Sequence, residues 1–103
     1  MTTLIIDTAN NRPITVGVKI NGEDFKSTEN ITSRSSRIVL SMIDSILRKH
    51  KIRLRDIDGI LVNTGPGSFT GLRAGIAIAN ALSYTLKVPV NGKKLGAKIT
   101  PKY

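Results

Sequence analysis

Residues 58–86 have the sequence DGILVN-TGPGSFTGLR-AGIAIANALSYTL, and this stretch decides the fold. Its first part, Asp58–Asn63, is a short apolar run that predicts a buried strand. A glycine-rich loop follows over Thr64–Gly71, and the apolar segment behind it predicts a helix from about Gly71 to Leu86. A strand that leads through a glycine-rich turn into a helix indicates an α/β domain.

Three further strands are predicted upstream of this unit. Thr2–Thr8 is an apolar run rich in β-branched residues, which is typical of a buried strand. Ile14–Ile20 alternates apolar and polar residues and predicts a strand with one buried face. Asn21-Gly22 is a strong hairpin signal, so Glu23–Thr28 is expected to return as a more polar edge strand.

A first helix is expected from about Ser33 to Lys49, since Arg48 and Lys49 suit the negative end of a helix dipole. Val88–Val90 would begin a last strand. The order β-β-β-α-β-α-β predicts an α/β fold, a single ribonuclease-H-like or actin-like lobe with a mixed sheet. We expect residues 1–90 to form this lobe and residues 91–103 to be a basic, weakly ordered tail.

The charge of the chain is strongly and unevenly positive. The 103 residues carry a net charge of +9, and every acid lies at or before Asp58. Such an excess favours RNA, anionic lipid or an acidic protein as a neighbour, and a solvated surface explains it equally well. The chain has no cysteine and a single histidine, His50, which excludes thiolate and multi-histidine metal sites.

No segment predicts secretion or a membrane span. Met1-Thr2-Thr3 lacks the basic start of a signal peptide. The most apolar stretch, Ala74–Leu86, is shorter than the ~20 residues that cross a bilayer. We therefore expect a cytoplasmic protein that has no membrane contact.

Both predicted helices carry more apolar surface than one sheet can cover, and Ala74–Leu86 has no charge at all. A row of small residues on the second helix would let another helix approach closely. This row packs either against the first helix of the same chain or against another subunit, and the excess of apolar surface favours the second interpretation. The predicted partner interface consists of Val39, Met42, Ile43, Ile46, Gly71, Gly75, Ile76, Ala79 and Ser83.

The glycine-rich loop has two interpretations. Backbone N–H groups at the start of a helix can hold a phosphate, but the loop lacks the GK[ST] sequence of a Walker A motif. Its spacing favours a structural tight turn, with Phe69 anchored in the core. Asp7 could orient Mg²⁺ or a water in an actin-like phosphate site, or it could simply hydrogen-bond the backbone of a neighbouring loop. Ser68 and Thr70 have no evident base, and His50 is predicted to be a surface or helix-capping residue.

Three segments together resemble the TsaB family, also called YeaZ. They are Ile5–Ala9, Arg37–Ile43 and, above all, the string GPGSFTGLRAG at Gly65–Gly75. The resemblance extends from about Leu4 to Val90 and corresponds to the N-terminal lobe of a usual family member. The family-motif loop contains Gly65, Pro66, Gly67, Ser68, Phe69, Thr70 and Arg73.

The resemblance implies an actin-like (ASKHA) lobe and a role in making N6-threonylcarbamoyladenosine (t6A) in tRNA. It implies a non-catalytic paralogue of TsaD that binds and stabilises TsaD through its two helices, with the ATPase TsaE joining the pair. ATP and metal are then expected only on the partner subunits, with no cofactor on this chain and tRNA reached indirectly. Asp7 and Thr8 would be a vestigial phosphate site.

Two alternatives remain from the residues alone. The chain could be a truncated or degenerate module that forms a homodimer through the same two helices. The tail from Lys87 to Lys102 could also bind tRNA weakly and directly. Catalysis by this chain alone is the least favoured interpretation, since no nucleophile and base stand at a recognisable spacing.

Overall fold

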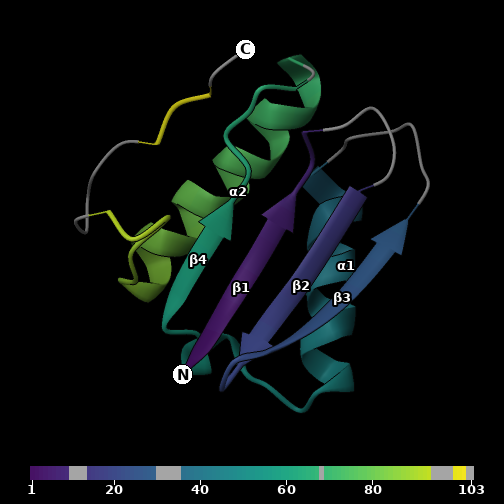
Figure 1. Cartoon of the computed structure of the whole chain (residues 1–103), viewed down its shortest axis with the longest axis vertical. Helices are drawn as coiled ribbons and strands as arrows, with labels where there is room; N and C mark the ends of the chain where they lie inside the picture. Colours follow the sequence, from purple (N-terminus) through teal and green to yellow (C-terminus); the bar gives the residue numbers. More distant parts are fainter. Residues whose placement is uncertain (10–13, 30–35, 68, 94–98, 102–103) are drawn as a thin grey trace.

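The computed structural model describes residues 1–9, 14–29, 36–67, 69–93 and 99–101. These residues form one mixed sheet with two helices packed on the same face (Figure 1). The elements along the chain are strand β1 (Thr2–Asp7), strand β2 (Ile14–Ile20), strand β3 (Glu23–Glu29), helix α1 (Ser36–Lys49), the 3₁₀ turn η1 (Leu54–Asp56), strand β4 (Gly59–Val62) and helix α2 (Phe69–Leu86).

The sheet has the strand order β3-β2-β1-β4. β1 is antiparallel to β2, with Leu4 opposite Val18, and parallel to β4, with Leu4 opposite Ile60. The central place of β1 follows from its sequence, since Leu4–Ile6 is an uninterrupted apolar run. The mixed sheet with its two helices confirms the predicted α/β fold class.

The predicted last strand is reduced to a single parallel bridge between Val90 and Ile60. Asn91 explains why the pairing stops there. Its backbone adopts a positive φ of 53°, and its side chain turns back onto β4. Asn91 Oδ1 accepts the Val62 N–H at 2.8 Å, and Asn91 Nδ2 donates to the Val62 carbonyl at 3.1 Å. The side-chain amide thus replaces the next residue of a strand.

The observed boundaries differ slightly from those predicted. α2 begins at Phe69 rather than Gly71, so Gly71 lies inside the helix. Residues 33–35 of the predicted first helix lie outside the described residues. Within the predicted tail, Ile99 is only 5% exposed, and its carbonyl accepts the Asn80 Nδ2 at 3.3 Å. This point of the tail therefore packs against α2, while residues 94–98 and 102–103 lie outside the described part.

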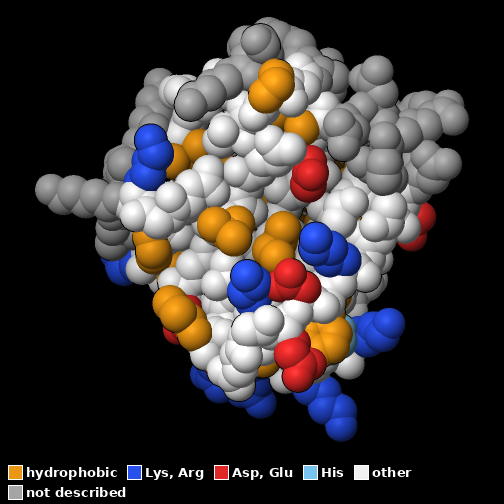
Figure 2. Space-filling view, in the orientation of Figure 1, with side chains coloured by type: hydrophobic (Ala, Val, Ile, Leu, Met, Phe, Trp, Pro, Cys, Tyr) orange, Lys and Arg blue, Asp and Glu red, His pale blue; other side chains and the backbone are white. Residues whose placement is uncertain are grey.

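The core lies between the sheet and the two helices. Strand alternation directs Leu4, Ile6, Val16 and Val18 toward the helices, and all four are 0% exposed. The other face of the sheet is the one seen in Figure 2, where hydrophobic side chains lie among charged ones. Leu61 of β4 belongs to this face and is 42% exposed. Within the described residues, no helix has the length and hydropathy needed to cross a membrane.

Leu4→Ala should lower the free energy of unfolding by about 2–5 kcal/mol, because it opens a cavity in the core between the sheet and the helices. Leu61→Ala removes the same atoms from a half-exposed site and should cost at most about 1 kcal/mol. Urea denaturation of both variants measures the difference. Equal losses would contradict the placement of the core on one face of the sheet.

Candidate functional site

The glycine-rich loop is tied to the end of β1 by Asn63. Asn63 Nδ2 donates to Asp7 Oδ1 at 3.2 Å, and Asn63 Oδ1 accepts the Gly65 N–H at 2.9 Å. Asp7 Oδ1 also accepts the N–H of Ala9 at 3.1 Å. The Asp7 carboxylate therefore holds its own turn and the side chain of Asn63, the residue before the loop.

Thr8 connects the same turn to the first part of α2. Its side chain is 0% exposed, and its hydroxyl donates to the carbonyl of Gly71. A hydroxyl buried in this way needs a partner, because an unpaired one costs about 1–3 kcal/mol. Both candidate phosphate residues, Asp7 and Thr8, thus bond to this chain itself. The vestigial phosphate site stays a prediction.

Two glycines of the motif allow this close packing. A Cβ on Gly67 would lie 2.5 Å from the carbonyl oxygen of Ala9, and a Cβ on Gly75 would overlap the Thr8 hydroxyl. The loop and α2 can approach β1 only because both side chains are absent. Arg73 is exposed on the outer side of the helix. The predictions for Ser68 and for the side chains of Phe69 and Thr70 lie outside the described residues.

The predicted partner interface is corrected by the packing of the helices. Most of its residues face the sheet and are buried within this chain, while Ser83 is partly buried and donates its hydroxyl to the Val88 carbonyl. The buried ones fill the core and are unavailable to a partner. These residues are Val39, Met42, Ile43, Ile46, Gly71, Gly75, Ile76 and Ala79.

A different set of apolar residues is accessible on the two helices. Leu40 of α1 is 46% exposed, and Ala77 and Ala81 are exposed on α2. With Ile78 and Leu82 they line a shallow groove of about 240 Å³. We call this set the helix groove. Helical spacing could have indicated it, since Ala77 and Ala81 are one turn apart and share one side of α2.

A second hollow lies between the edge strand β3 and the last turns of α1. Its volume is about 360 Å³, and Phe25, Ser27, Ser45, Lys49 and His50 are among its lining residues. The rings of Phe25 and His50 are 4.4 Å apart between centroids, so His50 is half-buried against β3 rather than free on the surface. No local sequence signal indicates this pair, because its two residues are far apart in the chain. Among the described residues, no group of three or more acidic, histidine or cysteine side chains could hold a metal ion.

The element order and the mixed sheet define an actin-like lobe, and comparisons with known proteins narrow this class. The family model for TsaD, tRNA N6-adenosine threonylcarbamoyltransferase, matches residues 29–92. The tRNA threonylcarbamoyladenosine biosynthesis protein TsaB of Bacillus subtilis is 34% identical over 94 residues, covering 88% of this chain and 40% of the relative. TsaB of Buchnera aphidicola subsp. Schizaphis graminum is 38% identical over 68 residues, covering 66% of this chain and 32% of the relative.

The fold agrees with these relatives. The solved structure of YeaZ from Pseudomonas aeruginosa superposes with a TM-score of 0.81 at 29% identity, covering 87% of this chain and 43% of that one. The chain therefore belongs to the TsaB (YeaZ) family and matches its N-terminal region. It spans less than half the length of these relatives.

Gly75→Ala should lower the free energy of unfolding by about 1–3 kcal/mol, because the added Cβ displaces the Thr8 hydroxyl. Gly59→Ala is the matched control, since its Cβ would meet only the Pro89 carbonyl oxygen at 3.8 Å. Its effect should stay within about 1 kcal/mol. Thermal or urea unfolding compares the two, and equal stability of both variants would refute the close contact of α2 with β1.

Proposed function

We propose that this chain is a non-catalytic scaffold subunit of the machinery that makes t6A in tRNA. In this role it binds and stabilises a TsaD-like subunit through the helix groove. The names of its relatives support a place in t6A biosynthesis. The observation that carries the docking role is the exposed apolar groove formed by Leu40, Ala77, Ile78, Ala81 and Leu82.

The chemistry of the groove favours a protein partner. Its exposed lining is almost wholly apolar, which suits a protein contact that excludes water. The small side chains of Ala77 and Ala81 allow a partner helix to approach closely. Both helices are held rigidly on the sheet by Val39, Ile43 and Leu72, so the groove is preformed and binding orders little of the chain.

The polar groups of the loop support a structural rather than a chemical role for this chain. Asp7, Thr8 and Asn63 are each engaged in hydrogen bonds that fix β1, the loop and α2 relative to one another. Side chains engaged in this way fix the positions of these elements and are poorly placed to bind a substrate. In this proposal nucleotide, metal and catalysis belong to the partner subunits, a TsaE-like ATPase joins the assembly in the cytoplasm, and the TsaD-like subunit presents the tRNA.

Ala77→Arg should abolish the mixed complex, because docking would bury an unpaired guanidinium in an apolar contact. Ala77 is exposed, so the chain itself should remain folded. Ser41→Arg is the matched control. Ser41 is exposed and lies on the same side of α1 as Ser45, away from α2. Light scattering after size exclusion, on mixtures with the TsaD-like subunit of the same organism, measures the masses.

The proposal predicts a mixed complex for the wild-type chain and for Ser41→Arg, and separate proteins for Ala77→Arg. A complex that survives Ala77→Arg would exclude the helix groove as the docking site. A wild-type chain that forms only a homodimer through this groove, and ignores the TsaD-like subunit, would favour the self-associating alternative.

A further inference from the structure

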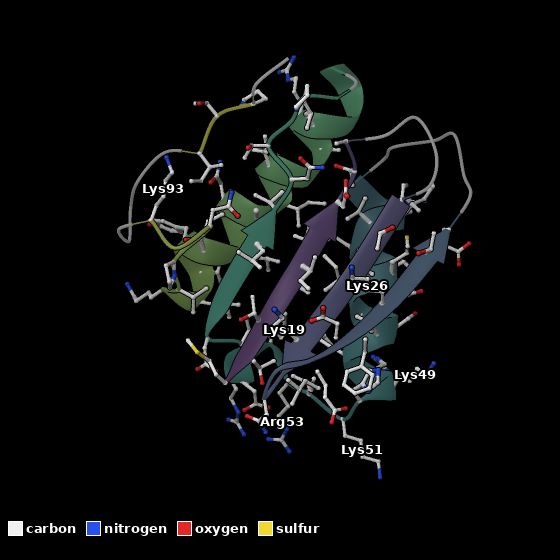
Figure 3. The ribbon with its side chains drawn as sticks, viewed as in Figure 1. Lys19, Lys26, Lys49, Lys51, Arg53 and Lys93 are labelled. Atoms are coloured by element: carbon white, nitrogen blue, oxygen red, sulfur yellow. The ribbon has the colours of Figure 1, made fainter. Side chains whose placement is uncertain are left out.

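The end of the molecule at which α1 finishes is strongly basic. Five of the eight residues from Arg48 to Arg55 are lysine or arginine. Lys49, Lys51, Arg53 and Arg55 are all exposed, and we call these four the basic end. Figure 3 shows Lys49, Lys51 and Arg53 at the same end of the fold, reaching into solvent, and basic side chains project there in Figure 2.

The cations of the basic end have no salt-bridge partner within the described residues, where the two ion pairs are Lys19–Asp24 and Arg48–Asp44. The two acids nearest in sequence serve backbone groups instead. Asp56 Oδ2 accepts the Arg53 N–H at 3.0 Å, and Asp58 Oδ2 accepts the Thr2 N–H at 2.8 Å. The basic end therefore presents positive charge that the fold itself does not pair.

Lys51 has a backbone conformation that is unfavourable for a lysine. It closes α1 with a left-handed φ of 56°, while its N–H donates to the Arg48 carbonyl at 3.1 Å and the Ile52 N–H donates to Leu47 at 2.8 Å. This is the position after a helix at which glycine is preferred, because a Cβ is strained there. Lys87 closes α2 in the same conformation, with a φ of 57°. It offers a control of identical backbone and charge at another site.

The hollow beside Phe25 and His50 adjoins the basic end, since Lys49 belongs to both. The described residues that line it contribute hydroxyl, ammonium and imidazole groups and no carboxylate. Its volume of about 360 Å³ is near the lower bound for small-ligand sites, which suits one nucleotide. Cations that follow a backbone next to an aromatic surface are the usual features of single-stranded nucleic-acid binding.

We propose that the basic end and this hollow form an RNA-binding surface, which takes one nucleotide of an unpaired RNA segment into the hollow and its neighbouring phosphates onto Lys49, Lys51 and Arg53. An acidic peptide could neutralise the cations, but it has no flat base to fill the space beside Phe25 and His50. The surface is separate from the helix groove, because Ser45 and Lys49 face β3 whereas Leu40 faces α2.

The proposal rests on the proposed function only in taking tRNA as the RNA. Fluorescence anisotropy with a labelled, unmodified tRNA transcript tests it on the whole chain. Removing three cations (Lys49→Ala, Lys51→Gly and Arg53→Ala together) should weaken binding at least about tenfold, and should reduce the slope of log K against log salt by about 2. An unchanged affinity and slope would overturn the proposal.

The single variants separate binding from folding. Lys51→Gly should bind RNA a few-fold more weakly while its melting temperature stays equal or rises, because glycine relieves the left-handed strain. Lys87→Gly should gain the same stability and keep its affinity for RNA. Equal losses of affinity in both variants would show that only net charge matters, and would overturn the assigned location.

A matched pair of variants tests the hollow separately. Ser45→Glu places a carboxylate in the hollow and should weaken RNA binding about tenfold, whereas Ser41→Glu, one turn earlier on α1, should have a much smaller effect. Labelled polyglutamate serves as the competing acidic probe. If it binds as tightly as the tRNA and is equally sensitive to Ser45→Glu, the surface recognises an acidic protein and the RNA proposal fails.

Failure of this proposal can be distinguished from failure of the proposed function. Ala77→Arg should bind RNA like the wild type, and the triple cation variant should still form the complex with the TsaD-like subunit. Loss of RNA binding in Ala77→Arg would place the RNA contact at the helix groove and overturn the separate surface.

Discussion

The contact of β1 with the loop and α2 is the constraint on which the rest of the structure depends. The buried Thr8 hydroxyl bonds the Gly71 carbonyl, and Gly75 lies directly over it, so the helix axis is fixed at the closest approach that a backbone without side chains allows. With α2 held there, Leu72 and Ile76 enter the core between the helices and the sheet. Asn63 sets the direction of the loop by bonding both Asp7 and Gly65. The family string at Gly65–Gly75 therefore serves first of all to pack the loop and α2 against the end of β1.

This constraint separates the surfaces of the two helices. Because α1 and α2 both lie on one face of the sheet, each uses its broadest apolar side on the core. The helix groove, with Leu40 on α1 and Ala77 and Ala81 on α2, remains accessible. The opposite side of α1 faces β3, where His50 meets Phe25. The helix groove and the hollow beside Phe25 and His50 therefore lie on different sides of the same short helix.

The chain belongs to the TsaB family, and the match covers less than half the length of those relatives. The part that is matched contains a packed core and both candidate surfaces. In the proposed scaffold role, the helix groove would supply the face that a partner contacts. The helix groove and the basic end are separate surfaces. A subunit that held a protein partner and an RNA at the same time would need two such surfaces.

The sequence by itself determined the kind and order of the four strands and two helices, because hydrophobic alternation, the Asn21-Gly22 turn and the apolar run of α2 are local signals. It also determined the family, through the string at Gly65–Gly75. Only the tertiary structure decided which side of each helix faces the sheet, so Val39, Met42, Ile43 and Ile46 proved to be core rather than interface. It also decided that Asn91 limits the predicted last strand to a single bridge and that His50 meets Phe25. The contacts of Asn91 and His50 join residues far apart in the chain, which no local pattern predicts. The periodicity of a helix shows how wide its apolar side is, but it does not show which element will cover that side.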